Sequence, residues 1–365
     1  MENDCMAGKS RVGMNRYQLM FSENKRVNNA AFKAPEDVAA IAAGLGFRRL
    51  DINVRYRAFS DRSKLVEGYY YLKSVIQCLS VLVKVRKDSV VLIQTPTGGG
   101  FVRNYMLDKL RRRKHVKFIS LFHDVEKLRG IQLGADEEYF FSFLLSISDV
   151  IIVHNSRMKE WFMKEMKVDD KRIVSLDVFD YLYKPEPRER KLKRHVIIAG
   201  NLDPKKARYL SSLRELKTEF VLYGSNFDES VSGENIIYRG SFPPEELPGV
   251  LEDGFGLIWD GDSGETCSGM FGNYLRYNNP HKLSLYLASG LPVFIWKEAA
   301  EAEFVEKYGV GYAVSSLSDI ASILDRITDD EYRELCLRVE AVSLKLVSGF
   351  FTQNALTAAL ERIGQ

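Results

Sequence analysis

The chain has 365 residues, of which 45% are hydrophobic and 28% are charged, and its 52 lysines and arginines against 49 acidic residues leave a net charge of +3. This composition is typical of a folded globular protein and excludes the disordered, collagenous and uniformly basic classes. The length favours two domains over one. Because the net charge is small, any attraction to phosphate or anionic lipid must come from local clusters of basic residues.

The four cysteines, at positions 5, 78, 267 and 336, are far apart and form no C-x-x-C pair. This spacing predicts neither a disulfide framework nor a structural zinc site, and it is typical of a reducing cytoplasm. No run approaches the roughly 18 apolar residues of a membrane span, and the first residues lack the apolar core of a signal peptide. We therefore expect a cytoplasmic protein that at most touches the inner face of a membrane.

Short apolar runs alternate with helical segments along the chain, which is typical of parallel β/α units. Strands are predicted in the first half at Tyr17–Phe21, Arg49–Val54, Ser89–Gln94, Phe118–His123 and Asp149–His154. In the second half they are predicted at His195–Ala199, Glu219–Tyr223, Ile236–Tyr238, Gly256–Trp259, Pro292–Trp296 and Gly311–Val314. Helices are predicted between them, among others at Pro35–Leu45, Tyr70–Val83 and Tyr139–Ser146.

A charged segment with two prolines, residues 184–194, separates the two halves and suits neither a core strand nor the interior of a helix. We predict a first domain over residues 1–186 and a second over residues 187–347. A final amphipathic helix, Thr352–Ile363, follows a glycine break at Gly349. We expect residues 348–365 to return to the first domain, which completes a two-domain α/β fold.

A polar cluster at residues 278–282 precedes an apolar helix that ends at Gly290. Free backbone N–H groups and the positive end of the helix dipole attract anions at such a start, and Lys282 adds a full charge. This arrangement suits a diphosphate. A capped helix with solvated polar side chains explains the pattern equally well.

A second candidate anion site lies where the strand ending at Ala199 passes through Gly200 and Asn201 into a lysine-bearing helix start with Lys205 and Lys206. Small residues let a ligand approach the backbone, and a lysine can neutralise phosphate charge. The G-x-G-x-x-G spacing of dinucleotide sites is absent, so a plain strand-to-helix turn is the alternative.

His123 and Asp124 follow an apolar strand, at the end where open α/β sheets bind their ligands. A histidine beside a carboxylate suits general-base chemistry on a sugar hydroxyl. The alternative is that Asp124 caps the helix that begins at Val125. The glycine-rich stretch Gln94–Gly100 lacks the G-K-[ST] ending of a phosphate-binding loop, and we interpret it as a loop over a cleft between the domains.

Basic residues concentrate in Arg103–Lys117, which holds seven lysines and arginines against one aspartate. Such a face can attract anionic lipid head groups at about 1 kcal/mol per basic residue. A solvated helix face is the simpler reading, and no nucleic-acid-binding module is visible. We therefore expect no nucleic-acid partner.

The block Y-N-N-P-H-K-L-S-L-Y-L-A-S-G-L-P-V-F-I-W at residues 277–296 resembles glycosyltransferases of the GT-B type. The similarity is to bacterial β-1,6-galactofuranosyltransferases and to the glucosyltransferases that extend N-acetylglucosamine on serine-rich-repeat adhesins. It covers most of the chain, with H-D-V-E-K-L-R at 123–129, D-V-I-I-V-H-N-S-R-M at 149–158, F-G-L-I-W-D-G-D-S at 255–263 and G-F-F-T at 349–352.

The resemblance implies two Rossmann-like domains with a central cleft, the second holding a UDP-sugar and the first a glycan or glycoprotein acceptor. It implies donor contacts at Asn29, Gly200, Asn201, Lys206, Tyr223, Ser241, Phe242, Asn279, Pro280, His281, Lys282, Leu283 and Ser284. His123 and Asp124 would face the acceptor. No metal or other cofactor is implied, because a helix dipole and basic residues stabilise the departing diphosphate; Asp260-Gly-Asp262 is interpreted as a turn.

The function expected on this basis is transfer of a hexosyl unit from UDP-galactofuranose or UDP-glucose to a sugar hydroxyl. His123, with Asp124, would deprotonate or orient the acceptor, while Lys282 and Lys206 hold the UDP. The loop at residues 22–30 departs from the glycine- and Ser/Thr-containing loop of the family. That departure favours the alternative of a catalytically silent GT-B module that binds a glycan or stabilises another transferase. Homo-oligomer formation is left open.

Overall fold

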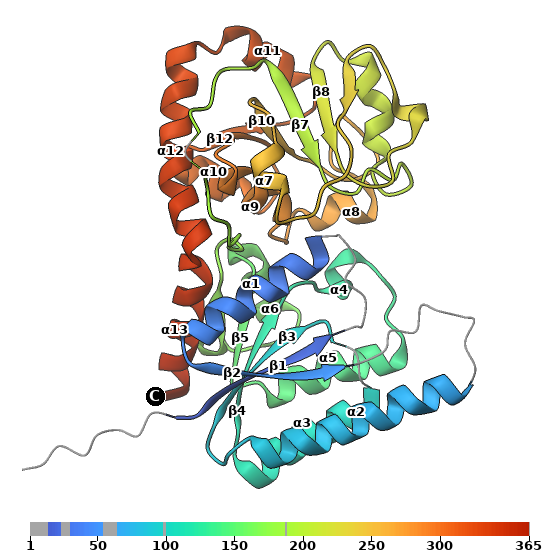
Figure 1. Ribbon diagram of the computed structural model, residues 1–365, viewed down its shortest axis with the longest axis vertical. Coiled ribbons are helices and arrows are strands. Elements are labelled where there is room, and N and C mark those ends of the chain that lie inside the picture. The colour runs from blue at the N-terminus through green and yellow to red at the C-terminus, as the bar shows by residue number, and fades with distance from the viewer. Residues whose placement is uncertain (1–13, 23–29, 54–63, 98–99, 187, 365) are drawn as a thin grey trace, which may run out of the picture.

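The computed structural model describes residues 14–22, 30–53, 64–97, 100–186 and 188–364, and it contains two α/β domains stacked one on the other (Figure 1). The first domain is built on a parallel sheet with the strand order β2-β1-β3-β4-β5-β6. Its strands are β1 (Arg16–Ser22), β2 (Phe47–Asn53), β3 (Val90–Thr95), β4 (Lys117–Phe122), β5 (Val150–Val153) and β6 (Ile173–Ser175).

The second domain is built on another six-stranded parallel sheet, with the order β12-β11-β10-β7-β8-β9. Its strands are β7 (His195–Ala199), β8 (Glu219–Tyr223), β9 (Ile236–Tyr238), β10 (Phe255–Ile258), β11 (Val293–Trp296) and β12 (Gly311–Val314). The strand order reverses direction between β1 and β3 in the first sheet and between β7 and β10 in the second. Doubly wound sheets bind ligands beyond the carboxyl ends of the strands at such points.

The eleven strands predicted from the sequence are all present, so the two-domain doubly wound fold is confirmed. Strand β6, a three-residue strand at the edge of the first sheet, was not predicted from the sequence. Every residue of β3, β5, β7, β10 and β11 is buried, as expected for parallel strands covered on both faces.

Helices cover both faces of the first sheet. One face carries α1 (Ala30–Gly44) and α13 (Phe350–Gly364), and the other carries α2 (Lys64–Lys84), α3 (Gly100–Lys114), α5 (Ala135–Ile147) and α6 (Ser156–Lys164). Short elements connect the rest of this domain: α4 (Glu126–Arg129) and the 3₁₀ helix η1 (Asp170–Arg172).

The helices of the second domain include α9, whose residues 283–288 are buried on every side. The α-helices are α7 (Leu247–Val250), α8 (Gly269–Tyr274), α9 (His281–Ala288), α10 (Ala302–Tyr308), α11 (Asp319–Arg326) and α12 (Asp329–Ser348), and the 3₁₀ helices are η2 (Arg208–Glu215) and η3 (Glu229–Val231). Among the described residues, no helix is both long enough and apolar enough to cross a membrane.

The last helix returns to the first domain, as the sequence predicts. Helix α12 ends at Gly349, whose φ of +82° is the left-handed conformation that stops a helix and redirects the chain. The carboxylate of Asp180 then accepts hydrogen bonds from the backbone N–H groups of Phe351 (3.2 Å) and Thr352 (2.6 Å), at the start of α13. Figure 1 shows α12 running beside the second domain and α13 continuing along the first.

Candidate active site

The carboxyl ends of β7, β8 and β9 form a tight backbone platform in the second domain. The N–H of Gly200 donates to the carbonyl of Tyr223 (2.9 Å), and the N–H of Gly224 donates to the carbonyl of Gly240 (2.8 Å). Gly224 has a φ of +150°, and a Cβ there would lie 1.7 Å from the Gly200 oxygen. Only glycine allows this approach, which leaves backbone rather than side chains at the sheet edge. The predicted residues Ser241 and Phe242 follow β9, with the Phe242 ring centroid 6.2 Å from that of Tyr223.

Lys282 points at this platform from the first turn of α9. A Cβ on Gly200 would lie 3.4 Å from Cε of Lys282. The Lys282 ammonium donates to the carbonyl of Trp259 (3.1 Å) and to Oδ1 of Asp260 (2.8 Å). These contacts use two of its three hydrogens, and the third can serve a ligand. Burial alone would lower the pKa of Lys282, but the Asp260 carboxylate outweighs it and raises that pKa.

The site therefore lies at the switch point between β7 and β10. Asp260 follows β10 and is the ion-pair partner of Lys282, whereas the sequence suggested only a turn at Asp260-Gly-Asp262. The D-x-D spacing of Asp260 and Asp262 was the sequence feature that could have drawn attention to Asp260. Pro280, the buried N-cap residue of α9, makes no side-chain cap, so no side chain of the cap residue competes for the N–H groups of the first turn.

The segment after Gly200, which carries Asn201 and Lys206, is not helical as predicted. The predicted lysine-bearing helix start is wrong, because residues 204–206 form a turn and η2 begins only at Arg208. Lys206 is exposed there. Asn201 is also exposed, and its side-chain oxygen accepts from the Asp203 N–H (3.1 Å) and from Nδ2 of Asn226 (2.9 Å).

Asn279 and Ser284 hold the two domains together. The Asn279 side chain donates to the carbonyls of His154 (3.0 Å) and Asp177 (2.9 Å) and accepts from Nδ2 of Asn155 (2.7 Å). The Ser284 hydroxyl donates to the carbonyl of Phe179 (2.6 Å), and the side chain of Leu283 is in the core. These three side chains are occupied by protein contacts, so only the backbone at these positions is left for the donor contact that the sequence predicts.

His123 is held in one orientation by Gln94 of β3. The Gln94 amide nitrogen donates to the carbonyl of Pro35 (3.1 Å), which can only accept, so the Gln94 oxygen faces Nε2 of His123 at 2.6 Å. Nε2 therefore carries the proton and Nδ1 is the basic nitrogen. Nδ1 is buried and has no hydrogen-bond partner among the described residues. Burial, with the nearby His281 and His154, keeps the pKa of His123 well below its usual value.

A stack of rings connects His123 to the start of α9. The ring of Phe179 lies between those of His123 and His281, at centroid distances of 5.2 and 4.8 Å, and His154 meets its edge at 5.0 Å. Burial lowers the pKa of His281 to about 4 and that of His154 to about 3, so both rings are neutral near pH 7. The stack brings His123 of the first domain to the helix start that carries Lys282. Phe179 lies in an irregular segment, and no sequence pattern singled it out.

The sequence suggested that Asp124 pairs with His123, but the structure gives Asp124 other partners. Its carboxylate pairs with Arg129 (2.6 Å) and accepts a hydrogen bond from the Tyr274 hydroxyl of α8 (3.4 Å). The alternative is also wrong, because the N-cap of α4 is Val125, without a side-chain cap. Burial raises the pKa of Asp124 to about 6. The Val125 N–H donates to the same Tyr274 hydroxyl (3.0 Å), so this segment fastens the domains together.

Two further expectations concern other regions. Asn29 lies outside the described residues.

The Arg103–Lys117 segment is not a uniformly free basic face. Arg103 is buried, with its guanidinium 3.3 Å from the centroid of Phe140. Arg111 and Lys117 both pair with Asp149, at 2.6 and 3.1 Å. Within the described ranges, no group of three or more metal-ligating side chains is gathered.

Comparison with known proteins identifies both domains. The family model described as "Glucosyltransferase 3-like, N-terminal domain" matches residues 17–178, and the one described as "Glucosyltransferase 3-like, C-terminal domain" matches residues 196–359. The fold resembles that of sucrose-phosphate synthase from Thermosynechococcus elongatus, with a TM-score of 0.62 at 11% identity over 96% of this chain and 100% of that one.

Two relatives extend the match in sequence. The β-1,6-galactofuranosyltransferase WbbI of Escherichia coli is 34% identical over 79% of this chain and 84% of its own length. Glucosyltransferase 3 of Streptococcus gordonii is 24% identical over 92% of this chain and 95% of its own. The resemblance seen in the sequence is thereby confirmed, and this protein belongs to the glucosyltransferase 3-like family, as a hexosyltransferase that uses a nucleotide sugar.

Proposed function

We propose that the protein transfers a hexosyl unit from a UDP-sugar, UDP-galactofuranose or UDP-glucose, to a sugar hydroxyl of a glycan or glycoprotein. The observation that carries this proposal is the ring stack through Phe179, which joins the unpartnered Nδ1 of His123 to the α9 start that bears Lys282. A base and an anion site on opposite domains are what transfer between two bound sugars requires. Membership of a transferase family favours this function over a catalytically silent module.

In the proposed donor site, the diphosphate lies against the glycine platform at Gly200 and Gly224. The remaining hydrogen of the Lys282 ammonium and the N–H groups that begin α9 bind its oxygens. These groups stabilise the negative charge that develops on the leaving UDP. The proposal needs no metal ion, because a cation and a helix dipole already supply positive charge at this position.

In the proposed transfer step, binding of the acceptor makes the buried Nδ1 of His123 accessible, and this nitrogen accepts the proton of the acceptor hydroxyl. A bond forms between that oxygen and the anomeric carbon of the donor as the bond from this carbon to the UDP oxygen breaks, and the electron pair leaves with UDP. Because His123 is neutral near pH 7, it is in the form that accepts a proton. Asp124, fixed by Arg129 and Tyr274, would position the segment that carries His123.

We place this reaction in the cytoplasm, at the inner face of the membrane. The described cysteines, Cys78, Cys267 and Cys336, are all free thiols, which fits a reducing compartment. Fewer residues of Arg103–Lys117 are available for membrane contact than the sequence suggested. Arg103, Arg111 and Lys117 already have partners within the domain.

Isothermal titration calorimetry with UDP tests the donor site. We expect saturable heat with the wild-type protein, its loss in Lys282→Met, and little change in Lys206→Met, since Lys206 is exposed on a turn. The matched lysine variant controls for the loss of one positive charge. Absence of heat with wild-type protein at millimolar UDP, or equal heat in the two variants, would contradict the site.

A further inference from the structure

Helix α2 carries a stripe of large apolar side chains on its solvent side. The stripe consists of residues spaced three and four apart, which places them on one side of the helix: Tyr69, Leu72, Ile76, Leu79 and Val83. They are between 54% and 81% exposed. The opposite side, with Cys78, Val81 and Val85, is buried against the sheet. Packing within the domain therefore accounts for one apolar side of α2 and leaves the other unexplained.

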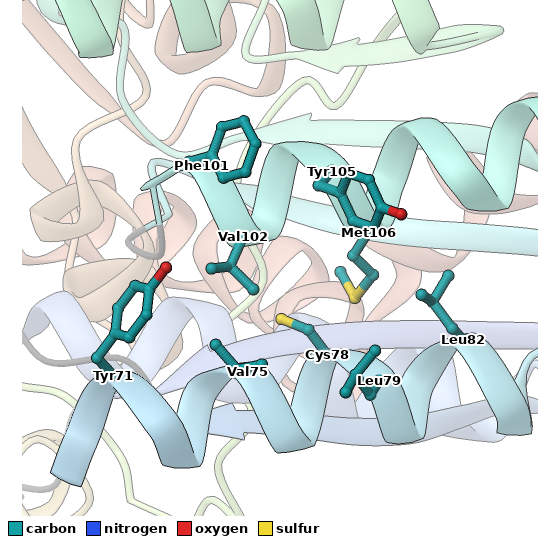
Figure 2. A pocket seen from close by; sticks show the side chains of 9 residues that line it. All are labelled: Tyr71, Val75, Cys78, Leu79, Leu82, Phe101, Val102, Tyr105 and Met106. Carbon is teal, nitrogen blue, oxygen red and sulfur yellow. The ribbon is translucent and has the colours of Figure 1, made fainter. Parts of the chain in front are cut away.

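The apolar surface continues onto α3. Phe101 is 79% exposed, and its ring stacks on that of the exposed Tyr105 at 6.4 Å. Between the two helices lies an open cavity of about 210 Å³, with Tyr71 and Leu79 on the α2 side and Phe101 and Met106 on the α3 side. Figure 2 shows these side chains around the cavity. We call the exposed surface formed by Tyr69–Val83 of α2 and Phe101–Tyr105 of α3 the α2–α3 face. Contiguous apolar surface of this kind marks an interaction site.

Strong positive charge accompanies this surface. Residues 68–117 contain eleven lysines and arginines against two aspartates, although the whole chain has a net charge of only +3. Arg103 is buried, and Arg111 and Lys117 pair with Asp149 outside this range, so the free positive charge comes from the others. At the carboxyl ends of the two helices Lys84, Arg86, Lys87 and Arg113 are exposed, and none of them forms an ion pair with a residue that the structure describes. An exposed aromatic and aliphatic surface on helices that end in unpaired cations matches the boundary between acyl chains and anionic head groups.

The positive charge of the α2–α3 region favours a lipid surface over a second copy of this chain as the partner of this face. A second copy of this chain placed on the α2–α3 face would bring two strongly basic segments together, and like charges at an interface are costly. An anionic lipid surface instead attracts each basic residue by about 1 kcal/mol. Lysine and arginine stems can further pack along the apolar surface while their charged ends stay in the head-group layer.

We propose that the α2–α3 face docks on an anionic lipid bilayer, with Leu72, Ile76 and Phe101 entering the interfacial layer. Both helices begin beyond the carboxyl ends of the strands that precede them, β2 and β3. The aromatic end of the face, with Tyr69 and Phe101, is therefore the end closer to His123, which follows the neighbouring strand β4. Docking would present the acceptor side of the enzyme to the membrane; this consequence rests on the proposed function, whereas docking itself does not.

Co-sedimentation with vesicles tests the docking. The full-length protein is mixed with vesicles of phosphatidylcholine and phosphatidylglycerol, and separately with vesicles of phosphatidylcholine alone. We expect binding to the first and much weaker binding to the second. The variant Leu72→Gln/Ile76→Gln should bind the anionic vesicles about tenfold or more weakly, because two leucine-sized side chains no longer enter the lipid. Arg86→Gln/Arg113→Gln should also bind more weakly, by roughly fivefold per charge.

The matched control is Leu337→Gln/Leu344→Gln on α12, whose side chains are 60% and 61% exposed, against 59% and 57% for Leu72 and Ile76. It should bind vesicles as the wild type does. The proposal is overturned if wild-type protein ignores anionic vesicles, or if the α2 variant binds them unchanged. It is also overturned if light scattering shows self-association that this variant abolishes, since a second copy would then cover the face. UDP titration of the same variant keeps this result separate from the proposed function, because the donor site lies in the other domain.

Discussion

The carboxyl edges of the two sheets meet at the domain interface with opposite chemistry. The first edge presents His123, a neutral imidazole buried against Phe179 and oriented by the amide of Gln94. The second edge presents Lys282, a paired cation, beside glycines that leave the backbone bare. Both sheets are parallel and doubly wound, so the difference comes from a few side chains at the strand ends and not from the architecture.

This difference separates two chemical tasks. Burial among rings favours the uncharged form of a histidine, which a proton acceptor needs. Pairing with Asp260 favours the charged form of a lysine, which an anion site needs. Variants on one edge should therefore change turnover, and variants on the other should change donor affinity.

The largest effect is expected from His123→Ala. Turnover should fall by about 10²–10⁴-fold, which is the usual contribution of a general base. UDP affinity should not change, because the donor groups belong to the second domain. Rates of UDP release with acceptor, together with calorimetry, measure both. Full activity in this variant would remove His123 from the mechanism while leaving the donor site intact.

The next effect is expected from Lys282→Met. Loss of a buried, hydrogen-bonded charge should weaken UDP binding by about 2–5 kcal/mol. The variant also leaves Asp260 without its partner, so thermal stability should fall as well. Lys282→Met/Asp260→Asn should recover stability and not affinity. If the double variant regained UDP binding, Lys282 would be a structural residue only.

A smaller effect, on stability, is expected from Gly224→Ala. A Cβ at this position would meet the Gly200 oxygen at 1.7 Å, so the backbone must shift in addition to tolerating a positive φ. We expect a loss of more than the roughly 1–3 kcal/mol of a strained residue. Gly46→Ala is the control, since Gly46 has a φ of +85° and open space around it. Urea unfolding of the two variants compares them, and equal losses would mean that the platform is not tight.

The smallest effect is a shift in pH dependence in Gln94→Glu. Because the pKa of His123 lies well below 6.5, the base stays neutral, and the acid limb of kcat/KM in the wild type should lie below pH 6.5. A carboxylate beside Nε2–H stabilises the imidazolium, so the acid limb of kcat/KM should move to higher pH by about one unit or more. Gln94→Ala, which removes the contact without adding charge, should lower kcat/KM without raising the limb. An unmoved limb in Gln94→Glu would mean that another group titrates.

The fold could be predicted from the sequence wherever burial leaves a local pattern. Continuous apolar runs predicted strands such as β3 and β11, and Gly349 predicted the break before the returning helix. Lys282 was found because a helix start is visible as polar residues before an apolar run. His123 was found because it follows a buried strand.

The remaining features of the site depend on contacts between segments far apart in the chain. Gln94 and His123 are 29 residues apart, and nothing near Gln94 in the sequence indicates its partner. Asn279 and Ser284 were assigned to the donor by the family resemblance at the start of α9, which does not say that their side chains contact the other domain. The partner of Asp124 proved to be Arg129, since side-chain direction is decided by packing and not by adjacency.

The returning helix has a consequence for how the protein is made. Ala355, Leu356 and Ala359 of α13 complete the core that covers Val90, Ile119 and Ile152 on one face of the first sheet. A ribosome delivers these residues only after the whole second domain has been synthesised. The domain that is translated first is therefore completed only after the second, and until then α1 alone covers this face of its sheet, so that apolar residues which α13 later buries stay exposed in the nascent chain.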